Sequence, residues 1–353
     1  MESTLGFHTT GRSAAAFVES YGSRTVRQLV SSSRAFFENP PEGFDRPLLT
    51  PRSLLWVADE SELATLEQLE SSVREFVPDA ELIDSLEAVR RCPVLDPAWV
   101  KMALVEQGAS DIDVNAIHQG FIKGMRARGG QIRTSAKVAS ITRTAGLWQV
   151  TTEAGEQYEA PIIVNAAGAW GDEVARIAGA EPIGLRPMVR NVFMVDRPAL
   201  PDDVVFSQLP LVFNVSGRFY FKPEGDSMLC SPADEVPSEP CDVKPQVEQI
   251  ARAIEDINTA TTMDIRHVRN SWAGLRTFVA DRTPVAGYDT EVEGFFWLVG
   301  QGGYGIETSP ALSRCAAAIL TGSPFPPDAS ARGLEAKDLH MSRLADAGEF
   351  VAH

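Results

Sequence analysis

The sequence has few of the residues from which metal sites, disulfide frameworks and membrane spans are built. Its 353 residues include four cysteines and five histidines, and neither type is spaced as C-x-x-C or H-x-x-x-H. The sequence therefore predicts no metal site and no disulfide framework. No apolar run approaches the roughly 20 residues that cross a bilayer, and the first residues lack the basic and apolar regions of a signal peptide. We expect a cytoplasmic protein with no integral membrane segment.

Basic residues are also scarce. The chain has 32 Lys and Arg against 48 Asp and Glu, which gives a net charge of −16 at pH 7. Nucleic acids and anionic membrane surfaces attract basic proteins, so we expect neither as a partner. The hydrophobic share of 44% is typical of a soluble globular protein, and the length allows about two domains.

Motifs of enzymes that supply their own chemistry are missing as well. The sequence contains no G-x-S-x-G elbow, no Walker P-loop, no H-E-x-x-H and no convincing Cys–His pair. Glycine turns are nevertheless present at the ends of expected strands. This combination is typical of proteins whose chemistry is carried by a cofactor.

The most informative stretch that is present lies near the C-terminal end. Residues 294–299 form an apolar run typical of a buried strand, four glycines follow, and residues 306–320 have the spacing of a helix. Free N–H groups and the positive end of the helix dipole meet at such a turn and favour a polar ligand. The glycines match G-x-G-x-x-G, but the second strand and acidic residue of a dinucleotide site do not follow. We therefore favour another polar cofactor edge, with close packing as the alternative.

Two further segments of small residues have two interpretations each. Residues 6–17 are rich in small and hydroxyl side chains and lead into a helix, so they form either a capped surface helix or a loop around a polar ligand. Residues 160–165 read as a buried strand that ends at small residues and a helix. There the backbone at Gly168 passes close either to a ligand or to a packing neighbour.

Arg276 is the most unusual charged residue. It lies in an otherwise apolar segment between Trp272 and Phe278, where an unpaired guanidinium is costly. It is therefore either paired with an acid in the core or placed as a bidentate clamp for a substrate carboxylate, which suits guanidinium geometry.

Six segments, in this order, resemble the D-amino-acid-oxidase-like superfamily of FAD-dependent oxidoreductases, and within it the bacterial D-arginine dehydrogenase group. The resemblance runs from about Gly6 to about Pro324, nearly the whole chain. The segments are HTTGRSAA (8–15), SRAFFENPPEGF (33–44), DIDVNAIHQGFIKG (111–124), VNAAGAW (164–170), WAGLRTFVADRTPVAGY (272–288) and GQGGYGIETS (300–309).

The resemblance implies a mixed α/β fold in which an FAD-binding Rossmann-like domain is interleaved with an antiparallel-sheet substrate domain. The cofactor domain would comprise residues 1–50, 100–185 and 270–325, and the substrate domain residues 51–99 and 186–269. Residues 326–353 would form a C-terminal tail, which has little periodicity and which we expect to be loosely ordered.

The first βαβ unit of the family, with its G-x-G-x-x-G, is missing from this chain. Either the true start lies upstream, or the chain is a truncation or a split subunit. Without that unit we expect weak or no FAD binding and an exposed sheet edge.

The resemblance also implies site residues. Arg276 would bind the substrate carboxylate with help from Tyr220 and Arg190, Tyr21 would close the pocket, and Gly303 would belong to this catalytic set. The residues that it places along FAD are Thr9, Thr10, Gly11, Arg12, Ser13, Ala14, Ala15, Ala16, Val138, Gly168, Gly302, Gly303, Tyr304, Gly305 and Ile306.

The implied reaction is oxidative deamination of a D-amino acid, a small-molecule substrate. Hydride would pass from the α-carbon to the flavin, and the imino acid would hydrolyse to a keto acid and ammonia. The electron acceptor is not indicated. The alternatives are another amine or hydroxy-acid flavoenzyme of the superfamily, and a non-catalytic remnant or subunit that does not hold FAD alone.

Three positions depart from relatives that act on cationic D-amino acids. Leu54 stands where they carry an acid, and Ala16 stands where a polar residue is expected. A buried anion would pair with a cationic side chain, so we expect neutral or apolar D-amino acids to be preferred. Glu307 stands where relatives tend to carry Gln, and we expect it to add a negative charge near the flavin.

Overall fold

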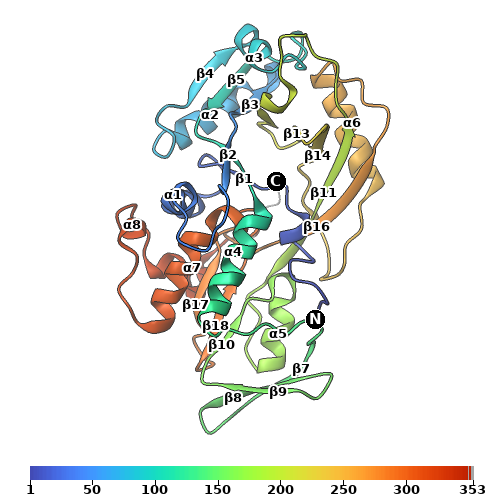
Figure 1. Cartoon of the computed structure of the whole chain (residues 1–353). Helices are drawn as coiled ribbons and strands as arrows, with labels where there is room; N and C mark the ends of the chain where they lie inside the picture. The colour runs from blue at the N-terminus through green and yellow to red at the C-terminus, as the bar shows by residue number, and fades with distance from the viewer. Residues whose placement is uncertain (349, 351–353) are drawn as a thin grey trace.

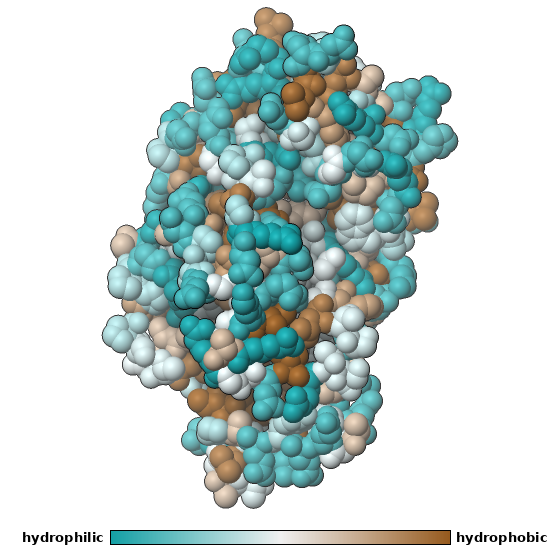
Figure 2. Space-filling model, viewed as in Figure 1, coloured by the Kyte–Doolittle hydropathy of each residue, from teal (hydrophilic) through white to brown (hydrophobic). Residues whose placement is uncertain are grey.

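The computed structural model describes residues 1–348 and 350, and it has the mixed α/β architecture that the sequence predicts. A nine-stranded sheet occupies the upper half of the molecule in Figure 1, and three three-stranded sheets lie beside and below it. Most of the viewed surface is hydrophilic, with a hydrophobic area in its lower half (Figure 2). None of the described helices is long and apolar enough to cross a membrane.

The large sheet is antiparallel except at one pair of neighbours, β3 and β12, which run parallel. This pair can be parallel because a long stretch of chain connects the two strands. The strands, in the order in which they pair, are β15 (Val236–Pro237), β11 (Arg186–Asp196), β14 (Ser227–Ser231), β13 (Tyr220–Glu224), β12 (Leu211–Asn214), β3 (Leu54–Ala58), β5 (Met102–Glu106) and β4 (Glu81–Asp84), and β16 (Asn270–Phe278) pairs with β11.

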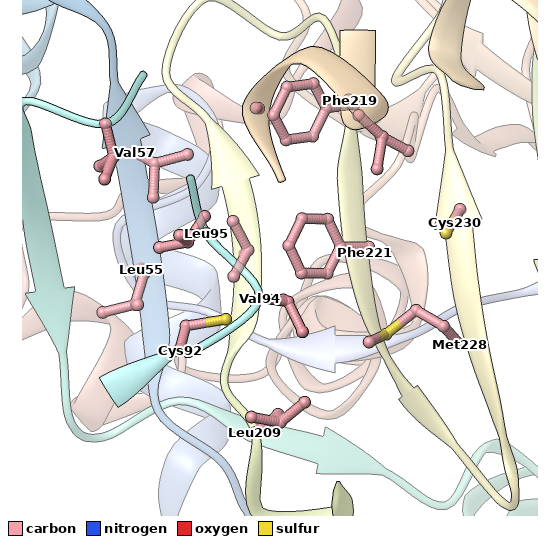
Figure 3. Packing of buried hydrophobic residues seen from close by; sticks show 14 of the residues in the cluster. Leu55, Val57, Cys92, Val94, Leu95, Leu209, Phe219, Phe221, Met228 and Cys230 are labelled. Carbon is pink, nitrogen blue, oxygen red and sulfur yellow. The ribbon is translucent and has the colours of Figure 1, made fainter. Parts of the chain in front are cut away.

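Both faces of the large sheet are covered, which explains why its central strands are almost continuously apolar. One face packs against α6 (Val247–Ala260) and the segment after α3 (Ser85–Arg91), and Figure 3 shows Phe219 and Phe221 in this core. The other face packs against α2 (Leu63–Val73). Each large apolar side chain buried in this way contributes about 1.5–3 kcal/mol.

A small sheet supports the glycine turn that the sequence singles out. Its order is β10 (Ile163–Asn165), β18 (Phe295–Val299) and β17 (Val285–Tyr288), with β10 and β18 parallel. Helix α7 (Gly305–Thr321) follows β18 and packs against α1 (Arg24–Glu38). Within the described residues β10 has a neighbouring strand on one side only, and Val164 on it is 42% exposed. The expectation that the chain lacks the first βαβ unit of the family, with its G-x-G-x-x-G, stays a prediction.

A third sheet connects the regions around the other two. It contains β1 (Ala16–Phe17), β6 (Ser110–Ile112) and β2 (Leu49–Pro51). Asp111 on β6 binds Arg52 Nε at 2.5 Å and Lys222 Nζ at 2.7 Å, and Lys222 belongs to the large sheet. Because the Lys222 side chain is buried, this pairing is what makes its charge tolerable.

Neighbouring segments of the chain contribute to different sheets: β2 pairs in the third sheet, whereas β3, which follows it closely, pairs in the large sheet. The two-domain division stays a prediction. Strands β5 and β16, which fall in segments assigned to the cofactor domain, pair within the large sheet.

The expectation of a loosely ordered tail is wrong for residues 327–346. This segment forms α8 (Pro327–Ser330) and the short helical turns Ala336–Asp338 and Met341–Asp346. Leu334 and Leu339 are fully buried against α7 and α1, and Arg343 Nε binds Asp281 at 2.7 Å. Residues 349 and 351–353 of the tail lie outside the described part.

The remaining sheet is a ribbon of β7 (Val138–Thr144), β8 (Leu147–Thr152) and β9 (Gln157–Ala160), at the bottom of Figure 1. Helix α5 (Gly171–Ala178) lies against β7. Helix α4 (Val114–Ala127) runs through the middle of the view, and it carries two glycines in different surroundings.

Those two glycines give a matched test of packing. A Cβ at Gly120 would lie 2.2 Å from the Phe44 ring, whereas a Cβ at Gly124 would meet only the end of Arg128 at 3.4 Å. We expect Gly120→Ala to lower the free energy of unfolding by about 1–3 kcal/mol through overpacking. Gly124→Ala should raise it by up to about 1 kcal/mol through helix propensity. Urea unfolding measures both, and equal effects would contradict this account of α4.

Candidate active site

A cavity of about 1170 Å³ lies where the large sheet, the N-terminal loop and the start of α7 meet. Typical small-molecule pockets have volumes of roughly 300–1,000 Å³, so this cavity has room for more than one small molecule. Its walls come from the loop at residues 1–16, the turn before α5, strands β11, β13 and β16, and the start of α7.

The turn between β18 and α7 forms one wall, and its shape requires glycine. Gly302 has φ +54°, and a Cβ there would lie 2.3 Å from the Phe278 ring. A Cβ at Gly303 would lie 2.7 Å from Arg276 Nη1. The amides of Gly303, Gly305 and Ile306 donate to no acceptor among the described residues, and all three residues line the cavity. The start of this 17-residue helix therefore offers free donors to a polar or anionic group.

Two arginines from neighbouring strands face the same cavity. Arg276 on β16 donates to Tyr21 Oη at 3.4 Å, and no described carboxylate lies within salt-bridge distance of it. Arg190 on β11 is buried, and its Nε donates to the Asp234 carbonyl oxygen at 2.7 Å, while its Nη1 has no partner. Burial, and then the nearby charge of Arg276, lower the pKa of Arg190.

The acids Asp234 and Glu235 pair with other arginines and not with Arg276. Arg190 Nε lies 3.8 Å from Asp234 Oδ1, and Arg190 Nη2 lies 3.7 Å from Glu235 Oε1. Arg282 Nη2 lies 2.6 Å from the same Glu235 oxygen. Asp234 and Glu235 therefore pair with Arg190 and Arg282, and neither acid is within salt-bridge distance of Arg276. Arg276 is the cation that these acids leave without a counter-ion, which suits a site for a single carboxylate.

Aromatic rings form another part of the cavity wall. Phe213 and Tyr220 stack with centroids 4.7 Å apart, and Tyr21 lies 5.9 Å from Phe213 and 5.1 Å from Tyr304. Tyr21, Phe213 and Tyr220 line the cavity, whereas Tyr304 packs behind it. Such a wall favours the apolar part of a ligand and keeps water away from it.

Glu307 differs from the expectation that it adds a negative charge. It is buried in the first turn of α7, and its Oε2 accepts a hydrogen bond from the Val18 amide at 3.0 Å. Burial, and then the nearby Glu106, raise the pKa of Glu307 well above the ordinary range of a carboxyl group. A raised pKa favours the neutral form of the group, which resembles a glutamine in size and charge.

The cavity brings together all of the expected site residues except Gly11 and Tyr304. Gly11 shapes the loop instead, because its amide donates to the Gly6 carbonyl oxygen at 2.7 Å. Arg12 lines the cavity, but its guanidinium is engaged by Asp242, Val243 and Ala273. The catalytic and cofactor-binding roles of these residues stay predictions.

Other lining residues were not expected from the sequence. Val192 lies two residues after Arg190 on the same strand, so it faces the same side, and this alternation is a signal that could have found it. Leu211 and Phe213 come from β12, whose position depends on pairing with distant strands. No local pattern in the sequence reports that pairing.

Comparison with known proteins gives a family model described as FAD dependent oxidoreductase, which matches residues 1–319. Human dimethylglycine dehydrogenase is 27% identical over 237 residues, which are 61% of this chain and 26% of that protein. Mouse FAD-dependent oxidoreductase domain-containing protein 1 is 23% identical over 313 residues, which are 78% of this chain and 63% of that protein. The chain therefore spans about a quarter of the first relative and less than two thirds of the second.

Solved structures share the fold. L-proline dehydrogenase from P. horikoshii superimposes with a TM-score of 0.79 at 18% identity and covers 98% of this chain and 89% of its own. Glycine oxidase from Geobacillus kaustophilus superimposes with a TM-score of 0.74 at 19% identity, and the match covers 92% of this chain and 87% of that protein. The D-arginine dehydrogenase group is not confirmed by these comparisons and stays a prediction.

FAD is the cofactor of the matched family, and the cavity fits it on three observations. The volume exceeds that needed for an amine substrate. The free amides at the start of α7 can donate to the polar edge of a flavin. Gly168 has φ +56° with open space where a Cβ would stand, so the backbone there can approach a ligand closely.

Gly168 and Gly179 provide a matched test of this fit. Both have positive φ and nothing within 4 Å of a Cβ, but only Gly168 lines the cavity. Alanine at either position should cost about 1–2 kcal/mol of stability through backbone strain. Only Gly168→Ala should also weaken FAD binding, by about tenfold, because its methyl group occupies cofactor space. Unfolding curves and FAD fluorescence titrations measure the two effects, and equal FAD affinity in both variants would refute the placement.

Proposed function

Since the chain belongs to the family of FAD dependent oxidoreductases, we propose that it oxidises the amine of a neutral D-amino acid. The observation that carries this proposal is the guanidinium of Arg276, which faces the cavity with no acid to balance it. A substrate carboxylate supplies the missing charge, and the fork of N–H groups on arginine matches it in two hydrogen bonds.

Neighbouring residues complete the anchoring of the substrate. Arg190, on the strand beside Arg276, also lines the cavity and adds a second positive charge near the carboxylate. Tyr21 orients Arg276 through its hydroxyl oxygen. Tyr220 and Phe213 enclose the substrate side chain and exclude water from it. With the carboxylate fixed, the α-carbon has one position relative to the start of α7.

FAD held in this cavity would supply the acceptor for the hydride of the α-carbon. The residues of this chain bind and orient the substrate, and the free amides at the start of α7 favour negative charge on the group beside them. The imino acid then reacts with water to give a keto acid and ammonia. The substrate reacts in its neutral amine form, whose ammonium proton has gone to solvent, and loss of hydride then leaves an iminium group. The hydride step itself thus needs no acid–base pair from the protein, in agreement with the absence of catalytic motifs.

The preference for neutral side chains rests on the lining of the cavity. The wall around the arginines is aromatic and aliphatic, and Leu54, at the position where cationic-substrate relatives carry an acid, is outside the lining. The D configuration is supported by the six segments that resemble the D-arginine dehydrogenase group.

An N-methylated amino acid such as sarcosine is a second candidate substrate. The rings of Tyr21, Phe213 and Tyr220 surround one part of the cavity, and aromatic faces attract alkylated ammonium groups. The similarity to a protein named dimethylglycine dehydrogenase supports the same class.

Substitution of Arg276 tests the proposed function. Arg276→Met should reduce kcat/KM by about 100-fold or more, because an anchored carboxylate loses its buried partner. Arg276→Lys should recover only part of this loss, since lysine keeps the charge but not the fork. Arg269→Met, at an exposed ion pair outside the cavity, is the control and should behave as wild type. Unchanged kinetics in Arg276→Met would rule out the clamp.

A panel of amines tests the substrate class. The purified chain with FAD is mixed anaerobically with D-alanine, L-alanine, D-arginine or sarcosine, and bleaching of the flavin absorbance is followed. We expect D-alanine to bleach the flavin at least about tenfold faster than D-arginine, because a cationic side chain in this wall has no anion to pair with. Faster reaction with D-arginine would overturn the neutral preference, and faster reaction with sarcosine would favour the second candidate.

A further inference from the structure

Glu307 is a carboxyl group of the cavity wall that the proposed clamp does not use. It lines the cavity, yet the residue is buried, with only 4% of its surface exposed. Oε2 is held by the Val18 amide. Oε1 has no protein partner among the described residues and is not one of the fully enclosed unpaired atoms, so its accessible surface faces the cavity.

A second buried carboxyl group lies behind Glu307. Glu106 on β5 accepts hydrogen bonds from the Glu19 amide at 2.9 Å and from the Ser20 hydroxyl. Val18 and Glu19 are consecutive residues, so successive amides of one short segment hold the two carboxyl groups close together. Both oxygens of Glu106 accept hydrogen bonds, whereas Glu307 has a free oxygen that can carry a proton. Burial raises the pKa of Glu106 to about 7.

The charges that face Glu307 come from several elements. Neither Glu307 nor Glu106 has a cation within salt-bridge distance among the described residues. The like charges of Glu106 and Glu19 oppose ionisation of Glu307, and the positive charge of Arg276 favours it. The charge of Arg27 on α1 interacts electrostatically with Glu106 and Tyr304. Arg276 and Glu307 line the same cavity, and Arg276 Nη1 lies against Gly303 in the turn that leads into α7. An ionised Glu307 would therefore attract that guanidinium.

We propose that Glu307 decides whether Arg276 is available to a ligand. As a neutral acid, Glu307 leaves the guanidinium free to bind a carboxylate. As a carboxylate, it neutralises the guanidinium and turns away anions, so the cavity loses its anion site. Burial favours the protonated form of Glu307, and Glu106, once it ionises near its pKa of about 7, is the positioning residue that adds like-charge repulsion. This inference rests on the proposed role of Arg276, and it adds a proton-controlled gate to that role.

The direction in which pH changes carboxylate affinity follows from the ionisation of Glu307. A carboxyl group with a raised pKa is neutral below that pKa and charged above it, so carboxylate affinity is full at lower pH and is lost as pH rises. Once Glu307 ionises, the dissociation constant of a simple carboxylate should rise by up to about tenfold per pH unit.

Benzoate is a suitable probe because it has a carboxylate, an apolar ring and no amine. Its affinity for the purified full chain, with FAD supplied, is measured by calorimetry between about pH 6 and about pH 10, where benzoate is an anion and arginine a cation. Wild type should bind at least about tenfold more weakly at the upper limit. Glu307→Gln, a permanently neutral isostere, should change less than about twofold over the same range.

Glu106→Gln provides an independent arm if Glu307→Gln does not fold. Removing the like charge should lower the pKa of Glu307, so benzoate affinity should fall at lower pH than in wild type. Parallel profiles in wild type and Glu307→Gln, or a flat wild-type profile, would overturn the gate while leaving the clamp intact. Failure to bind benzoate at any pH, or wild-type affinity in Arg276→Met, would instead overturn the clamp and the gate together.

Discussion

The structure depends on one unbalanced charge, the guanidinium of Arg276 beside the glycine turn that begins α7. Nearby acids are already engaged, since Asp234 and Glu235 face Arg190 and Arg282. An unpaired cation at this depth is costly, and the fold tolerates it through Tyr21 and the open cavity. In the proposed function, the substrate carboxylate completes this charge balance.

The glycine turn is the structural condition for that arrangement. A side chain at Gly303 would strike Arg276, and one at Gly302 would strike Phe278. The same turn leaves amides unpaired at the start of α7, so a cofactor edge and a substrate carboxylate can lie close together. The long pairing of β11 with β16 fixes the positions of the two arginines relative to each other. Binding and orientation thus come from backbone geometry more than from reactive side chains.

Local patterns in the sequence predicted the parts of the site that are local. The strand, turn and helix at residues 294–320 and the odd position of Arg276 were readable because each lies within one short segment. Phe213 was not readable as a wall residue, because β12 reaches the cavity only through pairing with strands from distant segments. The raised pKa of Glu307 was not readable from the sequence, because it depends on burial in the fold and on Glu106, far away in the chain. The ordered tail was missed because Leu334 and Leu339 lie in short turns without periodicity.

The most direct test of the central claim is a crystal structure of the chain with FAD and benzoate. The account predicts that the benzoate carboxylate lies within hydrogen-bond distance of the Arg276 guanidinium and that its ring lies against Tyr21 and Phe213. The flavin should lie against the turn before α7. A benzoate bound elsewhere, or an Arg276 turned away and paired with an acid of the protein, would contradict the account.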